Sequence, residues 1–423
     1  METPSPLVIN LTAMAHGGSA MGRDDTGRVI FVPFAIPGET VRVRPIRSKQ
    51  RYAHAELLEV LEPSPFRVRP RCPHFGSCGG CHLQHVAYRA QLEFKTQVVS
   101  DQLSRVGKFD HPPVEPALPS PSAWEYRNSV SFSPSKDGEL GFWSSTEEQV
   151  IPIKECHIIR PALQRLHQSL DLQLPGLRRL TLRVGVGGDL LVVFETEDVE
   201  PPALETDLPV SAAMLLPTGE AANLVGENSL IESCAGREWR VSAGSFFQVN
   251  TGAAEHLVKW VHEFAALDGS ESVLELCNGV GLFTAGLSES AGRVTGIEAN
   301  PDAVADAAFN LDATDNVTLY EGTVEEILPV LSDRSFDVIV LDPPRSGVEP
   351  AVIDALLAIR APRIVYISCD PATFARDARR LARGAQPDLR DGYRLERVVP
   401  VDMFPQTFHI ETVSLLRRVD HKN

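Results

Sequence analysis

Long hydrophobic runs are absent from this sequence, and none approaches the ~18 apolar residues of a membrane-spanning helix. The segment 1–10 also lacks a basic stretch followed by an apolar core, which argues against a secretory signal. We therefore expect a cytoplasmic protein in a reducing environment, with no membrane association. In such an environment the seven cysteines indicate metal binding or catalysis rather than disulfide bonds.

Positive charge is also scarce, since 40 Lys and Arg stand against 56 Asp and Glu, for a formal net charge of −16. Taken alone, this balance argues against a nucleic-acid partner. The charge is uneven, however, because residues 1–110 carry 14 basic against 10 acidic side chains, whereas the rest carry 26 against 46. Eight basic residues gather within 42–71, namely Arg42, Arg44, Arg47, Lys49, Arg51, Arg67, Arg69 and Arg71. A local basic face of this kind can bind a polyanion.

The basic stretch overlaps an N-terminal segment with the pattern of a small β-barrel. Strand-like runs occur at 29–32, 39–43 and 55–60, and Gly and Pro residues separate or bound them. Such spacing is typical of an OB-like barrel, a fold that commonly binds nucleic acid. With the segment 15–18 near its start and 34–39 in its middle, this stretch resembles a TRAM domain, an RNA-binding module.

Three cysteines follow in a Gly-rich loop, namely Cys72, Cys78 and Cys81. Their side chains can converge on one centre because glycine lets the backbone turn tightly around it. A fourth ligand is needed, and Cys156 is the natural candidate. The alternative fourth ligands, for a zinc site, are the nearby histidines His74, His82 and His85. Four cysteines suit zinc or an iron–sulfur cluster, and the spacing alone does not separate these.

The next part of the chain combines one helix with a β-rich block. Residues 86–110 have helical periodicity, with an apolar face formed by Leu92, Val98, Val99, Leu103 and Val106. A Pro-rich linker covers 111–122. Strands are expected beyond it at 129–132, 140–143, 178–186, 190–195 and 239–242. This block is long enough for its own sheet, into which the cysteine loop would be pinned through Cys156.

From residue 255 onward, apolar strands alternate with helices. Strands are expected at 272–276, 294–298, 317–320, 336–342, 364–368, 397–399 and 412–416. Helices are expected at 255–266, from about 284, at 303–311 and at 372–383. This alternation predicts a doubly wound, Rossmann-like α/β domain. We thus expect three units, a barrel at 1–62, a β-rich central domain at 63–250 and an α/β domain at 251–423.

The loop after the first strand of the α/β domain is typical of nucleotide binding. Gly279 and Gly281 allow a ligand close to the backbone, and Glu298 ends the next strand, where a carboxylate accepts hydrogen bonds from ribose hydroxyls. The loop lacks the third glycine of a dinucleotide fingerprint, which disfavours a pyrophosphate ligand. Adenosine without a diphosphate, as in S-adenosylmethionine, fits better. The alternative is a tight turn with a surface Glu.

Asp342 ends another strand and begins an Asp-Pro-Pro-Arg-Ser-Gly segment. The two prolines after the acid give a rigid loop beside the expected ligand cleft. Methyltransferases that act on planar nitrogen atoms carry a related loop with Asn first and an aromatic last. Asp342 and Arg345 replace those residues here, which argues against amino-group methylation and for a target that is activated in another way.

Cys369 lies between the 364–368 strand and the 372–383 helix. Open α/β sheets concentrate their chemistry at this junction, and the field of the helix start favours a thiolate. The alternative is a small buried thiol. A thiolate here can add to C6 of uracil and give C5 the carbanion character needed to accept a methyl group. The C5 proton must then leave to a base, for which Glu411 and His409 are candidates.

Several segments together resemble the RNA 5-methyluridine (uracil-C5) methyltransferase family. The matching segments are 244–250, 342–347, 368–377 and 404–411. The resemblance covers essentially the whole chain, since the TRAM-like barrel and the cysteine loop also occur in members. It implies that Cys369 is the nucleophile and Glu411 the base. It further implies that Gln248, Glu298 and Asp342 contact S-adenosylmethionine.

The same resemblance implies that Cys72, Cys78, Cys81 and Cys156 hold a 4Fe–4S cluster. The glycine loop departs from the commonest family form, because Cys277, Asn278 and Leu282 occupy it. Gly279 and Gly281 remain as expected backbone contacts to the cofactor.

The implied reaction is C5 methylation of a specific uridine in structured RNA, with the base flipped towards Cys369. The barrel and the central domain would bind the RNA, and the combination of barrel and cluster favours 23S ribosomal RNA over transfer RNA. No protein partner is implied, and we expect a monomer. One alternative is an RNA-binding or redox-sensing protein with an inactive methyltransferase domain, which would not explain Cys369 together with Glu411. Another is a cytosine-C5 RNA methyltransferase, against which the Glu411 segment and the cluster argue.

Overall fold

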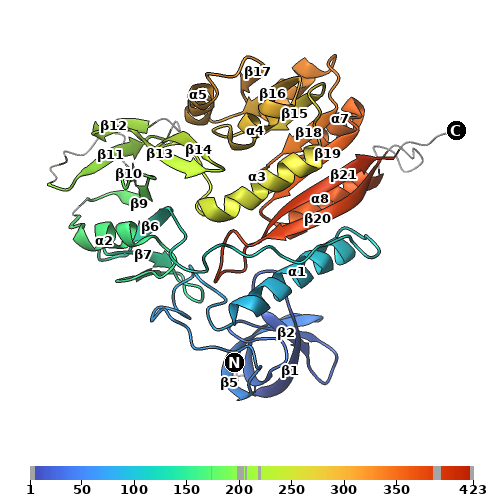
Figure 1. Cartoon of the computed structure of the whole chain (residues 1–423). Coiled ribbons are helices and arrows are strands. Elements are labelled where there is room, and N and C mark those ends of the chain that lie inside the picture. Colours follow the sequence, from blue (N-terminus) through green and yellow to red (C-terminus); the bar gives the residue numbers. More distant parts are fainter. Residues whose placement is uncertain are drawn as a thin grey trace.

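The computed structural model describes residues 5–172, 174–197, 204, 207–217, 221–383 and 392–419. Its N-terminal unit is a closed barrel with the strand order β1-β2-β3-β5-β4, drawn in blue in Figure 1. The strands are β1 (Leu7–Met14), β2 (Ala20–Arg23), β3 (Val29–Val32), β4 (Thr40–Ser48) and β5 (Tyr52–Glu62). Alternate side chains of β1 point inward, so that Ile9 and Leu11 join the barrel core. The barrel expected from the sequence is confirmed.

Helix α1 (Tyr88–Arg105) follows the barrel, and Figure 1 shows it running between the barrel and the C-terminal sheet. The helix is shorter than the expected 86–110. Val106 is exposed rather than part of the apolar face, because the helix ends there and Val106 is its C-cap. The buried face of α1 also contains two polar side chains, Gln91 and Lys95.

The central block forms a seven-stranded sheet in the order β12-β11-β10-β9-β6-β7-β8. Its strands are β6 (Ser129–Pro134), β7 (Leu140–Trp143), β8 (Val150–Pro152), β9 (Leu177–Val184), β10 (Leu190–Thr196), β11 (Val210–Leu215) and β12 (Ala221–Val225). The first four strands expected for this block are confirmed with small shifts at their ends, whereas β8, β11 and β12 were not expected. Helix α2 (Pro161–Ser169) packs on β9. The cysteine loop attaches to this sheet through the Gly79 N–H, which donates to the carbonyl oxygen of Trp143 at 2.9 Å.

The C-terminal sheet has seven strands in the order β17-β16-β15-β18-β19-β21-β20, and β21 runs antiparallel to both neighbours. Its strands are β15 (Ser272–Leu276), β16 (Arg293–Glu298), β17 (Val317–Glu321), β18 (Val338–Leu341), β19 (Arg363–Ser368), β20 (Tyr393–Val401) and β21 (Glu411–Arg418). The helices are α3 (Thr251–Ala265), α4 (Leu282–Ser290), α5 (Pro301–Asn310), α6 (Val324–Ile327), the 3₁₀ helix η1 (Leu328–Leu331), α7 (Pro350–Ile359) and α8 (Pro371–Arg383). The predicted α/β domain is confirmed.

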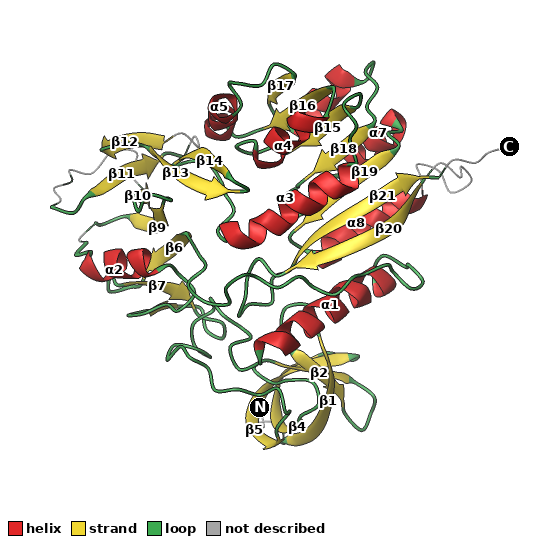
Figure 2. Ribbon diagram, in the orientation of Figure 1, coloured by secondary structure: helices red, strands yellow, loops and turns green. Residues whose placement is uncertain are grey.

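Alternation along these strands gives the sheet two apolar faces. In β15, Val273 joins a core with α3, α4 and α5, whereas Leu274 and Leu276 join a second core with α1, α7 and α8. Figure 2 shows the helices gathered on both sides of this sheet. The carboxyl ends of the parallel strands meet at one edge, and the residues that follow β15, β16, β18 and β19 are therefore neighbours.

Two segments from before residue 251 complete these cores. Helix α1 packs against α8 and β20, and the hairpin of β13 (Ser229–Cys234) and β14 (Arg237–Ser242) packs against α3 and α5. Both segments pack against the C-terminal domain although they precede residue 251 in the chain. The domain limits at residues 62 and 250 therefore stay predictions. Within the described ranges, no helix combines the length and the apolar character that crossing a membrane requires.

Candidate active site

Cys369 and Glu411 follow from the pairing of two antiparallel strands. β19 and β21 pair with Ser368 opposite Thr412. Continuing this register by one residue sets Cys369 opposite Glu411, and residues that are directly opposite project on the same face. Asp342 directly follows β18, which neighbours β19 on its other side, so that it lies at the same edge of the sheet. The sheet thus brings three predicted site residues together.

These three side chains line one cavity of about 720 Å³. The same cavity is lined by the predicted cofactor contacts Gln248, Gly279 and Glu298. Gly281 is not part of the lining. Its φ of 92° lies in the left-handed region, and it serves as the N-cap of α4. Gly281 therefore allows the turn from the loop into α4 rather than forming the cavity wall.

The carboxylate of Glu298 is fixed at the end of β16 by backbone donors. Its Oε2 accepts from the N–H of Gly279 at 2.9 Å. Its Oε1 accepts from the N–H groups of Ala299 and Asn300, both at 2.9 Å. Oε2 accepts a single bond and therefore has a further lone pair, so that Glu298 in this orientation can still accept a hydrogen bond from a ligand's hydroxyl.

The thiolate expected at Cys369 stays a prediction, and two features of the site oppose it. Burial and the nearby carboxylates of Glu411 and Asp342 raise the pKa of the Cys369 thiol to about 12, although Arg345 opposes this shift. The helix start does not compensate, because the side chain of Asp370 already occupies it. Asp370 Oδ1 accepts from the N–H groups of Ala372 and Thr373, both at 2.9 Å.

The side chain of Asp370 also contacts the N-terminal unit. His16 Nε2 lies 3.2 Å from Asp370 Oδ2, so that a side chain of the N-terminal unit contacts the cap of the helix that follows Cys369. Burial raises the pKa of Asp370, but the hydrogen bonds from His16 and from the N–H of Thr373 outweigh it and hold that pKa at about 2. Sequence reasoning missed this contact, because no local pattern links residues so far apart.

Glu411 is 6% exposed and shares the cavity with another acid. Burial, and then the charge of Asp342, raise the pKa of Glu411 well above its ordinary value, and Arg345 opposes the shift. In the same way, burial and the charge of Glu298 raise the pKa of Asp342 to about 7. A positively charged ligand in this cavity would oppose both shifts, because it favours the charged form of each acid.

Asp342→Asn is expected to stabilise the cofactor-free protein, and more so at about pH 8 than at about pH 5. The folded-state pKa of Asp342, about 7, lies above its ordinary value of 3.8. A raised carboxyl pKa favours folding at low pH, and this contribution is lost as the pH rises through the folded-state value. Thermal unfolding at both pH values measures the effect, with the exposed Asp333→Asn as control. An equal shift at both pH values would contradict it.

A second cavity, of about 270 Å³, is lined by all four predicted metal ligands, namely Cys72, Cys78, Cys81 and Cys156. Burial raises the pKa of Cys78 to about 11 and that of Cys81 to about 12, and the neighbouring thiols add to both shifts. Of the alternative histidine ligands, His74 lines this cavity. The four thiols thus line one cavity, while their role as ligands stays a prediction.

Among the residues that the structure describes, no three Cys, His, Asp or Glu side chains form a group that could hold one metal ion. A zinc site draws four ligands to within about 2.3 Å of one point. An iron–sulfur cluster binds its thiolates through several irons, so that the ligands surround a larger body. The four thiols that line this cavity are a donor set that suits either group.

His409, the second candidate base, lines the cysteine cavity rather than the larger one. Its Nδ1 lies 3.5 Å from an Arg345 nitrogen. Burial, followed by the charge of Arg345, lowers the pKa of His409 to about 3, so that its ring is neutral. Two aromatic rings of the larger cavity, Phe246 and Phe404, had no predicted role. Both belong to segments that resemble the methyltransferase family, 244–250 and 404–411, and this resemblance was the available sign of a role in the site.

Comparisons with known proteins identify the families that this chain matches. Residues 231–419 match the model of the tRNA (uracil-5-)-methyltransferase family, and residues 8–58 match the TRAM domain. An uncharacterized RNA methyltransferase of Thermosynechococcus vestitus is 33% identical over 445 residues, covering 97% of each chain. One of Aquifex aeolicus is 33% identical over 432 residues, covering 98% of this chain and 99% of the relative.

The chain belongs to the RNA uracil-5-methyltransferase family. This family member also resembles a solved structure, the Pyrococcus abyssi tRNA (uracil-54, C5)-methyltransferase in complex with S-adenosyl-L-homocysteine. The identity is 26% and the TM-score 0.73, over 97% of this chain and all of the other. The RNA uracil-5-methyltransferase described here is thus an S-adenosylmethionine-dependent enzyme with an N-terminal TRAM domain.

Proposed function

We propose that this enzyme methylates C5 of a specific uridine with Cys369 as nucleophile and Glu411 as general base. The observation that carries the proposal is the pairing of β19 with β21, whose last pair, Ser368 with Thr412, is followed directly by Cys369 on one strand end and preceded by Glu411 on the other. Both residues line the cavity that also contains the predicted cofactor contacts. A thiol and a carboxylate on opposite strands can act on adjacent atoms of one base, as this chemistry requires.

The proposed steps follow from the electronic structure of uracil. The Cys369 thiolate adds to C6, and the C5=C6 electrons move to C5, which bonds the methyl group that S-adenosylmethionine supplies as a sulfonium. Glu411 then removes the C5 proton, the C–H electrons re-form the C5=C6 bond, and sulfur leaves C6 as a thiolate. The products are 5-methyluridine, S-adenosylhomocysteine and a proton on Glu411.

The cofactor contacts are assigned by position in the cavity. Glu298 would accept from the ribose, while Gly279 admits the ligand close to the backbone and Gly281 permits the turn into α4. Gln248 and Asp342 would complete the contacts from the other walls. A cationic ligand in this cavity lowers the pKa of the adjacent acids and of the thiol, which prepares Cys369 and Glu411 for their roles.

Cys72, Cys78, Cys81 and Cys156 would hold a 4Fe–4S cluster, for which the common cavity is the support. The proposed methyl transfer moves no electrons between redox centres. We therefore assign the cluster a structural or RNA-positioning role.

Anaerobically purified protein is expected to be brown and to contain about four irons per chain. The iron content and the visible absorption spectrum measure this directly, without any activity assay. Cys81→Ser should lower both, whereas Cys234→Ser, which changes a buried thiol outside the cavity, should leave them unchanged. A colourless protein with one zinc per chain would contradict the cluster.

The RNA is proposed to bind across the barrel and the central domain. Four of the eight basic residues of 42–71 are engaged in ion pairs within the described part of the chain, namely Arg42–Glu59, Arg44–Glu56, Arg67–Glu39 and Arg71–Glu125. The exposed 47–51 segment presents Arg47, Lys49 and Arg51 to solvent. These three charges are suited to phosphate contacts.

Two RNA classes are candidates for the substrate. The combination of a TRAM domain with a four-cysteine site supports 23S ribosomal RNA, our first proposal. The likeness to the Pyrococcus abyssi tRNA (uracil-54, C5)-methyltransferase supports transfer RNA as the second.

Labelled S-adenosylmethionine and total RNA from a strain that lacks the gene decide between them. Label in 23S RNA as 5-methyluridine supports the first proposal, and label in transfer RNA supports the second. Mapping the modified nucleotide then identifies the site. The absence of transfer to any RNA by protein with its cysteine site loaded would contradict the proposed function.

A further inference from the structure

One segment separates the two cavities. Residues 402–410, called the 402–410 segment here, join β20 to β21 and lead directly into Glu411. Phe404 of this segment lines the larger cavity with Glu411, whereas Thr407 and His409 line the cysteine cavity. The 402–410 segment therefore borders both cavities and leads directly into Glu411, the first residue of β21.

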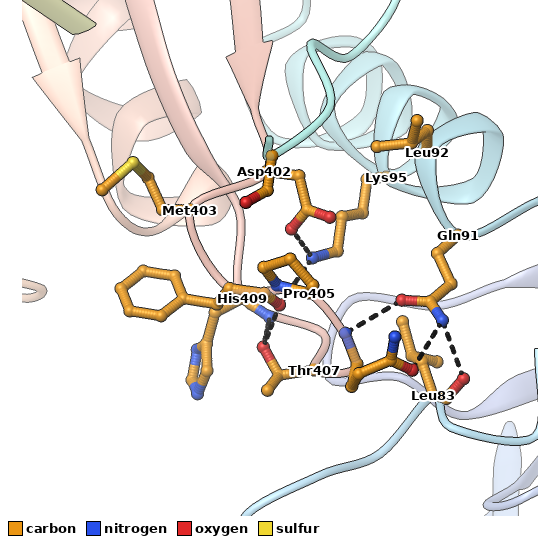
Figure 3. Close-up of polar contacts among 12 residues, drawn as sticks. Leu83, Gln91, Leu92, Lys95, Asp402, Met403, Pro405, Thr407 and His409 are labelled. Carbon is orange, nitrogen blue, oxygen red and sulfur yellow. Dashed lines mark hydrogen bonds and ion pairs between the residues drawn. The ribbon is translucent and has the colours of Figure 1, made fainter. Parts of the chain in front are cut away.

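Helix α1 holds the start of this segment with a buried cation. Lys95 Nζ donates to Asp402 Oδ1 at 2.6 Å and to the carbonyl oxygen of Phe404 at 3.1 Å. The side chains of Lys95 and Asp402 are 2% and 0% exposed. Burial lowers the pKa of Lys95, and the Asp402 carboxylate opposes that shift. Figure 3 shows Lys95 reaching from the helix to the segment.

The middle of the segment is held by Gln91, one turn earlier on the same face of α1. Gln91 Oε1 accepts from the N–H of Gln406 at 3.0 Å, and its Nε2 donates to Gln406 Oε1 at 3.0 Å. The same Nε2 also donates to the carbonyl oxygens of Leu83 and Val86. Gln406 has a left-handed φ of 69°, a conformation that needs such support in a residue other than glycine.

Further bonds come from the loop that contains the cysteines and from the central domain. The N–H groups of His82 and Leu83 both donate to the carbonyl oxygen of Gln406 at 2.9 Å. The Tyr126 hydroxyl donates to the carbonyl oxygen of Pro405 at 3.0 Å. The segment is thus fixed by polar contacts from outside the C-terminal domain.

Burying a polar or charged side chain in an apolar core carries a desolvation penalty, which reduces its net contribution to stability. A buried ion pair often contributes no more than well-packed apolar side chains of similar volume, whereas it does select one arrangement of its partners. α1 places such groups on its buried face where they contact the segment that precedes Glu411. Their effect is to fix that segment.

We infer that Gln91 and Lys95 are positioning residues for the reaction, which hold the 402–410 segment so that Glu411 meets the C5 proton of the substrate. The inference rests on the proposed roles of Cys369 and Glu411. Neither positioning residue lines the larger cavity, so each acts through the segment.

Loss of a residue that positions the base should affect turnover and adduct formation differently. Formation of the covalent adduct needs Cys369 and the methyl donor, whereas only its release needs the base. RNA that contains 5-fluorouridine traps the adduct, because fluorine at C5 cannot be removed as a proton. A misplaced base therefore slows turnover on ordinary RNA but leaves trapping on fluorinated RNA intact.

The test uses the full-length protein, transcripts of 23S RNA and transfer RNA, and Gln91→Met. Turnover should fall about a hundredfold with KM for S-adenosylmethionine unchanged, since small misplacements cost about that much. Adduct formation with fluorinated transcripts should match wild type, and a methylated adduct should accumulate on ordinary RNA. The control is Gln97→Met, on the exposed face of the same helix.

Lys95→Met leaves Asp402 buried and unpaired, so that the variant can fail to fold. The double variant Lys95→Met/Asp402→Leu removes both charges and should recover thermal stability, yet it still lacks the bond to the Phe404 carbonyl. Its turnover should stay low while trapping persists.

Full recovery of turnover in the double variant, or an equal fall of turnover and trapping in Gln91→Met, would overturn the inference. If the wild-type protein itself traps no fluorinated RNA, the proposed function fails instead.

Discussion

Cys369→Ala will form no covalent complex with RNA that contains 5-fluorouridine, and its methyl transfer will fall at least about 10⁴-fold. Without the sulfur, nothing adds to C6, and C5 of uracil stays too poor a nucleophile to take a methyl group. The complex is measured by its retarded migration in a denaturing gel, and methyl transfer by incorporation of labelled methyl groups into RNA.

A second thiol supplies the matched control. Cys277 lines the same cavity, and burial followed by nearby carboxylates raises its pKa to about 12, as for Cys369. Cys277→Ala should still form the covalent complex. A complex that persists in Cys369→Ala and disappears in Cys277→Ala would assign the nucleophile to the other cysteine.

Glu411→Gln will accumulate a methylated covalent adduct on ordinary RNA, while turnover falls by about 10² to 10⁴. The glutamine has nearly the same shape but cannot accept the C5 proton, so that the reaction stops before sulfur leaves C6. Mass spectrometry of the protein after ribonuclease digestion identifies the methylated nucleotide on Cys369.

The pH dependence gives an independent check on the same residue. The pKa values of Cys369 and Glu411 are both raised in the cofactor-free site, and both groups must be deprotonated to react. We therefore expect kcat/KM of the wild-type enzyme to rise with pH above the ordinary titration range of a carboxyl group. A flat profile, or release of product at the wild-type rate by Glu411→Gln, would assign the base elsewhere.

The strands of the catalytic sheet could be predicted because their residues are apolar on both faces and bounded by Gly, Pro or acids. The short edge strand β12 of the central sheet could not be predicted, since none of its residues is buried. The site residues could be located because each ends, directly follows or begins a strand, and a parallel sheet collects its strand ends at one edge. Position in the chain therefore indicated position in space for Glu298, Asp342, Cys369 and Glu411.

Electrostatics could not be predicted in the same way. The sequence indicated a helix start near Cys369, but the donors of that start are taken by Asp370, which the sequence also contains. The state of the thiol depends on Glu411 and Asp342, which come from other strands. Likewise, the basic cluster was visible in the sequence, but its pairing with acids of the same barrel was not.

The polar side chains of α1 were the hardest feature to interpret from the sequence. Gln91 and Lys95 alone resemble surface residues of an amphipathic helix. Their partners lie 315 and 307 residues further along the chain, beyond the range of any local pattern. Only the folded arrangement shows that they face the segment before Glu411.

This separation also affects how the protein forms during synthesis. N-terminal units generally fold first as the chain leaves the ribosome. The barrel can close early, but Lys95 must wait for 307 further residues before Asp402 exists to neutralise it. The buried face of α1 is therefore completed among the last steps, together with the pairing of β19 and β21. Cys369 and Glu411 thus come together only in a chain that is almost fully made.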